Sequence, residues 1–194
     1  DKYDDIDLMI ITSPNTLWLT RALVVLFLKL KHLRRPTSIP EHSSPRVSNK
    51  ICDNLYLDTN NLNVLKTYRS RSAFTLKKSL KIFLGHEVLH AKPIFDRGGI
   101  HHLFLKSNSW AANYLPIAYK ETIKSSIFHF PTSKSHFFTL KNFRKSFLWV
   151  TSIFYPINLI FFLTQYLYMK PKITSERIGL GFAFFHPNPR NDSP

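Results

Sequence analysis

The pattern of hydrophobic and polar residues predicts short strands near the start of the chain and longer helices after them. Segment 4–12, Asp-Asp-Ile-Asp-Leu-Met-Ile-Ile-Thr, has aliphatic residues on both sides of the pleat, which predicts a buried strand. Segment 50–58 predicts a second strand. Between them, segment 17–33 is apolar almost all round, which is typical of a helix buried in a core or lying on a sheet. Asn15 or Thr16 is its expected N-cap.

The rest of the chain reads as mainly helical. Apolar residues recur at helical spacing over 72–92, with lysines on the other faces, and a further helix is expected over 100–114, closed by Pro116. Residues 141–169 predict one long helix that contains Pro156. We therefore expect an α/β region at 1–66 and a helical C-terminal region at 67–194.

The long helix leaves two interpretations open. Its segment 147–169 carries no charged residue and is long enough to span a bilayer, which would make the protein membrane-associated. The alternative, which we favour, is a core helix kinked at Pro156 and made less hydrophobic by polar residues such as Asn158 and Gln165.

The composition of the chain indicates a class of binding partner. The chain has 194 residues, 44% of them hydrophobic, which suffices for a sizeable core, and a net charge of +15. Residues 61–194 hold 19 Lys and Arg against 5 Asp and Glu, so the basic excess belongs to the second half. A nucleoside triphosphate, a nucleic acid or another polyanion would suit this charge, and a solvated cationic surface is the alternative. The single Cys52 cannot form an intrachain disulfide and fits a reducing, cytoplasmic compartment.

The candidate chemistry begins at Asp5 and Asp7. Alternation along a strand places both carboxylates on one face, where two like charges repel each other unless a divalent cation neutralises them. Because hard oxygen ligands suit Mg²⁺ or Mn²⁺, the pair predicts a site for one of these ions.

The order Asp5-Ile6-Asp7, turn and apolar helix resembles the metal-binding strand of the DNA polymerase β-like nucleotidyltransferase superfamily. Further segments are similar to bacterial nucleotidyltransferase-domain proteins: Leu17-Trp18-Leu19-Thr20-Arg21, Leu33-Arg34-Arg35, Lys92 to Gly99, Asn108-Ser109-Trp110, Leu115-Pro116 and Phe184 to Pro187. The resemblance implies a nucleotidyltransferase-like small mixed sheet with flanking helices. It also implies metal-dependent transfer of a nucleoside monophosphate from a nucleoside triphosphate to an acceptor that the resemblance leaves open.

The resemblance implies specific residues as well. Asp5 and Asp7 would hold Mg²⁺ or Mn²⁺, and the second strand would supply a third catalytic carboxylate from Asp53 or Asp58. Strict alternation puts these last two on opposite faces, so only one can serve, and we prefer the mid-strand Asp53. The superfamily's Gly-Ser phosphate-binding segment precedes the acidic strand. Since it is missing here, we expect an N-terminally truncated fragment that binds nucleotide poorly.

A second motif competes with this interpretation. His86-Glu87-Val88-Leu89-His90 fits H-E-x-x-H, in which two histidines on one helix face bind Zn²⁺ and the glutamate acts as general base. Asp96 occupies the place of a third ligand in extended forms of the motif, but Pro93 stands where those forms have Gly. A zinc peptidase, possibly at a membrane, is therefore an alternative, and a catalytically inactive nucleotidyltransferase-fold binding module is another.

Overall fold

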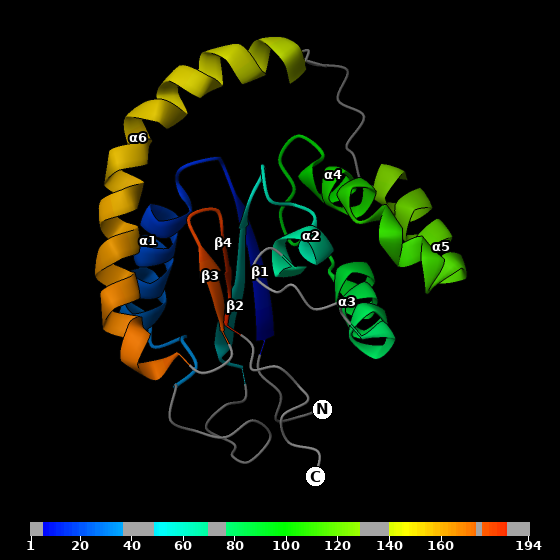
Figure 1. The fold of residues 1–194 in the computed structure, drawn as a ribbon, viewed down its shortest axis with the longest axis horizontal. Coiled ribbons are helices and arrows are strands. Elements are labelled where there is room, and N and C mark those ends of the chain that lie inside the picture. Colours follow the sequence, from blue (N-terminus) through cyan, green and yellow to red (C-terminus); the bar gives the residue numbers. More distant parts are fainter. Residues whose placement is uncertain (1–5, 37–48, 70–76, 129–139, 174–175, 186–194) are drawn as a thin grey trace. The chain divides into compact units, whose positions relative to one another are not determined.

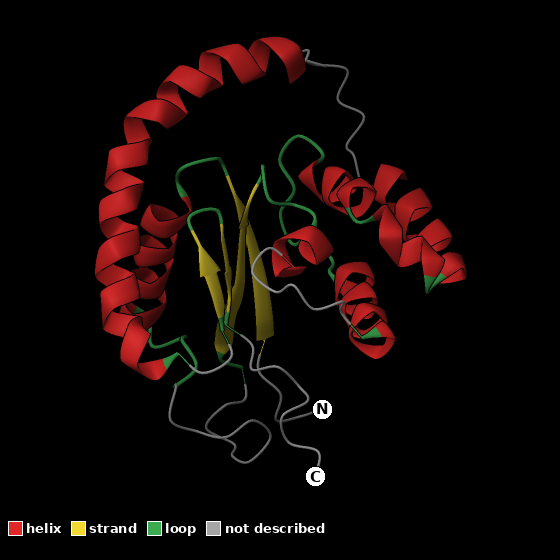
Figure 2. Ribbon diagram, in the orientation of Figure 1, coloured by secondary structure: helices red, strands yellow, loops and turns green. Residues whose placement is uncertain are grey.

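The computed structural model describes residues 6–36, 49–69, 77–128, 140–173 and 176–185 (Figure 1). The described residues form a mixed α/β structure with a four-stranded sheet and flanking helices (Figure 2). The chain divides into two compact units, one made of Asp1–Asp58 with Ser146–Pro194 and the other of Thr59–Lys145. The sequence placed a boundary near residue 66 and kept everything after it together. In the structure, the C-terminal segment instead returns to the unit that contains the sheet.

The sheet combines strands from both ends of the chain. Its order is β1 (Ile6–Thr12), β2 (Ile51–Asp58), β4 (Phe182–Phe184) and β3 (Arg177–Gly179). β1 and β2 are parallel, whereas β2 with β4 and β4 with β3 are antiparallel. The hairpin of β3 and β4 was not expected from the sequence. β1 lies at one edge of the described sheet, and Ile6 at its start is 48% exposed, so the expectation of a buried strand is wrong at this end.

Helix α1 (Leu17–Leu30) and helix α6 (Leu140–Met169) from Ser146 onward belong to the sheet-containing unit, and α6 continues into a short 3₁₀ turn, η2 (Lys170–Lys172). The structure confirms the long helix over the predicted residues, with Pro156 inside it. Contacts between the two helices advance in the same direction. Trp18 reaches Asn158, and Arg21, one turn later, reaches Gln165. The helices therefore run parallel and side by side, as Figure 1 shows.

The start of α1 is held by α6 rather than by its own N-cap. Thr16 occupies the N-cap position, but its hydroxyl donates to the Ser13 carbonyl and caps no amide of the helix. Instead, the Trp18 amide donates to Asn158 Oδ1 at 2.8 Å, and Gln165 Nε2 donates to the Trp18 carbonyl at 2.9 Å. The prediction of Thr16 as the N-cap residue is therefore confirmed in position, but its side chain makes no capping bond, and a residue far along the chain supplies the acceptor that the first turn needs.

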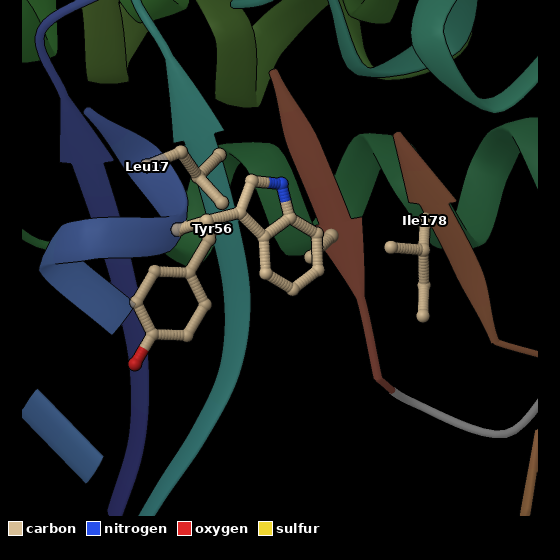
Figure 3. Close-up of a cluster of buried hydrophobic side chains, with 5 residues drawn as sticks. Leu17, Tyr56 and Ile178 are labelled. Carbon is tan, nitrogen blue, oxygen red and sulfur yellow. The ribbon is translucent and has the colours of Figure 1, made fainter. Parts of the chain in front are cut away.

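Trp18 also joins the helix to the sheet. Its side chain is fully buried, and its indole Nε1 donates to the Gly179 carbonyl at 3.0 Å. It belongs to a core cluster of residues from α1, β2, β3 and β4: Leu17, Trp18, Tyr56, Ile178 and Ala183. Figure 3 shows Leu17 and Tyr56 on one side of this cluster and Ile178 on the other, with the Tyr56 hydroxyl pointing away from Ile178.

The other unit is helical. It contains α2 (Val64–Arg69), α3 (Lys78–His90), α4 (Ile100–Ser107), the 3₁₀ helix η1 (Ser109–Asn113) and α5 (Pro116–Phe128). Pro116 was expected to close a helix, but it begins α5, where its fixed φ and missing N–H cause no loss.

Asn108 organises this unit. Its side chain is fully buried and satisfied: Oδ1 accepts from the Val64 amide at 2.8 Å and from Trp110 Nε1 at 3.0 Å. Its Nδ2 donates to the carbonyls of Leu62 and Phe104. Asn108 and Trp110, two of the residues in the resemblance, thus have a structural role here.

If the contact between α6 and the first turn of α1 anchors the unit, Asn158→Ala should lower the free energy of unfolding by about 1–3 kcal/mol, because it leaves the buried Trp18 amide without an acceptor. Urea denaturation followed by circular dichroism measures this change. Thr164→Ala is the matched control on the exposed side of α6, and it should change stability by less than about 0.5 kcal/mol. Equal losses in the two variants would contradict the anchoring role.

Candidate functional site

The carboxylate of Asp7 lies at the start of β1 and is exposed to solvent. Asn54 of β2 donates from Nδ2 to Asp7 Oδ1 at 2.6 Å, and Asn54 Oδ1 in turn accepts from the Cys52 thiol at 2.6 Å. Asp7 is therefore an exposed residue whose carboxylate is oriented by a side chain of the neighbouring strand. Asp5, its expected partner, falls outside the described residues.

Asp53 does not join Asp7. In the ladder between the strands, the Cα partner of Asp7 is Cys52, and the next residue, Asp53, faces the other side of the sheet. There Arg34 Nε donates to Asp53 Oδ1 at 2.7 Å and Tyr56 Oη donates to Asp53 Oδ2 at 3.1 Å. The side chain of Asp53 is almost completely buried, and both of its oxygens are engaged in this network. The expected convergence of Asp7 and Asp53 on one cleft is not what the structure shows.

A β-bulge in β2 explains why strict alternation of side chains does not describe the faces of this strand. Asp7 pairs with Cys52 but Met9 pairs with Leu55, so β2 carries one more residue than β1 between these pairs. Across such a bulge, the count that placed Asp53 and Asp58 on opposite faces no longer applies. Asp58 itself is buried at the end of β2, where its amide donates to the Gly181 carbonyl at 2.9 Å.

Arg21 extends the buried polar network around Asp53. Its Nη1 donates to Gln165 Oε1, and its guanidinium lies 4.4 Å from the centre of the Phe185 ring. Among the described residues, Arg21 Nε is a buried polar atom without a hydrogen-bond partner. Burial lowers the pKa of the Arg21 guanidinium from its ordinary value, and the nearby charge of Asp53 opposes this shift. Contact with an aromatic face compensates in part for the missing acceptor.

The network is polar and charged, and its anion is almost completely buried, whereas Arg34 and Gln165 are partly exposed. Its cations are Arg21 and Arg34, its anion is Asp53, and Gln165 and Tyr56 complete the hydrogen bonds. A carboxylate engaged by a guanidinium and a phenol has no free lone pair aimed at solvent for a metal ion. The arrangement therefore has a structural role at the contact between α1, α6 and β2.

The histidine motif lies on α3. The ring centres of His86 and His90 are 5.6 Å apart, and both residues are exposed, as is Glu87. Asp96 accepts a long 3.4 Å hydrogen bond from the His101 amide. Within the part of the chain that the structure describes, no group of three or more His, Cys, Asp or Glu could hold a metal ion. The histidines are thus brought together as a pair without a third ligand from the described residues.

Sequence reasoning missed most of the buried network. Arg21 entered the sequence-based interpretation only within a segment of the resemblance, yet a charge in an otherwise apolar helix is itself a signal of a buried partner. Tyr56 gave no such signal, because an aromatic residue in a strand is ordinary.

The chain was compared with known families, curated proteins and solved structures. None matches it. Over the described residues, no helix is both long enough and apolar enough to cross a membrane.

The pKa of Tyr56 provides a test of the network. Burial, followed by the charge of Asp53 and the hydrogen bond to it, raises the pKa of this phenol far above its ordinary value of 10.0. Because the folded-state pKa is raised, the folded chain keeps its full stability below about pH 10 and loses stability as the pH rises above it, by about 1.4 kcal/mol per pH unit. Tyr56→Phe should remove this alkaline loss, as measured by urea denaturation between pH 8 and pH 11.

The control is Tyr155→Phe, which removes an exposed phenol on α6. It should leave the alkaline slope of the wild type unchanged. An identical slope in the Tyr56→Phe protein would show that Tyr56 ionises freely in the folded state.

Proposed function

We propose that this chain takes part in metal-dependent nucleotidyl transfer and that Asp7, together with Asp5, is the metal-binding end of the site. The observation that carries the proposal is the exposed Asp7 carboxylate, oriented by Asn54 on a strand that leads into a helix. The mixed sheet with flanking helices fits the general α/β class, and the sequence resemblance is what points to nucleotidyl transfer within that class.

The donor atoms suit a hard cation. Mg²⁺ in phosphoryl-transfer sites takes one or two protein carboxylates and completes its shell with water and phosphate oxygens, so an exposed Asp7 with a neighbouring Asp5 would suffice. Bound there, the ion would neutralise charge on the triphosphate and on the leaving pyrophosphate. Asn54 holds the Asp7 carboxylate in one orientation, and the net charge of +15 favours the approach of a triphosphate. Asp53 has no part in this proposal, because Arg34 and Tyr56 occupy its oxygens.

Manganese titration tests the proposal. Mn²⁺ binding to the full chain, followed by electron paramagnetic resonance, should be lost in Asp7→Asn and in Asp5→Asn. Asn54→Ala should weaken it by roughly tenfold, because Asn54 orients the ligand without binding the metal. Addition of ATP should raise the Mn²⁺ affinity of the wild type, since the triphosphate supplies further ligands.

The control is Asp96→Asn, which removes one exposed carboxylate from the helical unit. Its Mn²⁺ affinity should equal that of the wild type. Equal affinities in Asp7→Asn and Asp96→Asn would refute the site. Mn²⁺ and ATP binding without pyrophosphate release, in the presence of the candidate acceptors, would identify a binding module with the same fold.

The paired imidazoles on α3 support a second candidate, Zn²⁺ binding by His86 and His90, with Glu87 available as a base. The distance of 5.6 Å between the ring centres allows both rings to approach one ion. His86→Ala should abolish Zn²⁺ binding measured by calorimetry. The control His32→Asn, at an exposed position with φ of 53°, should preserve it, because Asn tolerates this backbone conformation. Zn²⁺ binding that is the same in both variants would exclude the histidine pair.

A further inference from the structure

The outer side of α1 is apolar and exposed. Leu23, Leu26, Phe27 and Leu30 follow the spacing i, i+3, i+4, i+7, which places them on one face of the helix, and they are between 54% and 69% exposed. The residues that α1 buries, among them Leu17, Trp18 and Leu28, lie roughly opposite, at about 180° around the helix axis. An ordinary surface helix would carry polar residues on this outer face.

Helix α6 also has an exposed apolar stripe. Ile153, Ile157, Ile160, Leu163 and Leu167 are between 39% and 70% exposed. The inward residues of the same helix, which include Phe161, Phe162 and Met169, pack on the core cluster of the sheet. Because α1 and α6 run side by side (Figure 1), we consider their two exposed stripes together and call them the outer apolar face.

The exposed charged residues that the structure describes in α1 and at the ends of α1 and α6 are lysines. Lys29 and Lys31 at the end of α1 and Lys170 at the end of α6 are exposed, and the parallel run of the helices brings these ends to the same side of the unit. The sequence has no acidic residue between Asp7 and Glu41 or between Glu121 and Glu176, the segments that contain the two helices. The face therefore combines exposed aliphatic side chains with cations that lack any acidic residue beside them in sequence.

This combination of exposed aliphatic side chains and cations favours one kind of binding partner. A second copy of the chain, paired face to face, would bury the aliphatic stripes but would offer the lysines no acidic partner from its own α1 or α6. A nucleic acid would satisfy the cations but could not bury the aliphatic stripes. A bilayer surface that contains anionic phospholipid satisfies both, because its acyl region accepts aliphatic side chains while its headgroups pair with lysine.

We propose that the outer apolar face of α1 and α6 binds peripherally to the surface of an anionic phospholipid bilayer. The helices lie in the plane of the interface, and the sheet behind them stays outside the bilayer. This binding is independent of the metal chemistry proposed for Asp7, because Asp7 is not part of either helix.

Vesicle flotation with the full chain tests the proposal. The protein should float with phosphatidylcholine vesicles that contain about 30% phosphatidylglycerol and remain in solution with pure phosphatidylcholine, and added salt should weaken binding. Leu26→Gln/Leu30→Gln/Ile160→Gln should bind at least about tenfold more weakly, because three aliphatic side chains no longer enter the lipid. Lys29→Gln/Lys31→Gln/Lys170→Gln should also lose between about tenfold and a hundredfold.

Each variant has a matched control in the helical unit. Ile94→Gln/Phe95→Gln/Ile117→Gln changes three residues that are 74% to 85% exposed, and Lys66→Gln/Lys120→Gln/Lys124→Gln removes three exposed lysines. Both controls should float like the wild type, and circular dichroism should show that all four variants remain folded.

Three results would overturn the proposal. The first is a wild type that binds neither vesicle or binds both equally. The second is a loss of binding in the controls as large as in the outer-face variants. The third is sedimentation showing a dimer that Leu26→Gln/Leu30→Gln/Ile160→Gln converts to a monomer, which would assign the face to a second copy of the chain.

Discussion

The contact between α6 and the first turn of α1 holds the sheet-containing unit together. Asn158 and Gln165 reach from α6 to the two sides of the Trp18 peptide unit, one accepting from its amide and the other donating to its carbonyl. The indole of the same residue continues to the Gly179 carbonyl of β3. If α6 shifted along α1, the Trp18 amide and carbonyl would lose their partners while still buried, so the contact specifies one position of α6 on α1 as well as stabilising it.

The contact between α1 and α6 also buries a charge, the guanidinium of Arg21. Arg21 lies one turn after Trp18 and is buried with it, and only Gln165, the aromatic rings and the charge of Asp53 are available to compensate its lost hydration. Asp53 is shared with Arg34, so the network contains more positive than negative charge and depends on every member. Removing a single partner from such a network costs more than any one hydrogen bond in it contributes. This requirement explains why Asp53 is a structural residue although its place in the middle of a strand suggested a catalytic one.

The hydrophobic periodicity of the sequence was sufficient to predict an element where the residues of that element alone determine the pattern. The uncharged run at 147–169 predicted a helix, and α6 includes it, while the segment that ends in Asp58 predicted β2. Prediction failed where two distant segments meet. The cap of α1 comes from Asn158, the bulge in β2 changes which residues share a face with Asp53, and the hairpin of β3 and β4 is short enough to leave little alternation to detect. The prediction for Pro116 failed for a local reason, because a proline can end the preceding helix and also favours the first turn of the next one.

The amino-acid sequence by itself determined the α/β class, the main helices and strands, the excess of positive charge and the acid at the start of β1, since these depend on composition and on the spacing of neighbouring residues. Only the tertiary structure decided which polar residues are buried together, which side of β2 carries Asp53, and that α1 and α6 turn an apolar stripe away from the sheet. A helix that is apolar all round does not reveal which of its faces will be covered. That choice depends on where the chain returns, and here α6, β3 and β4 return to α1 from the far end of the sequence.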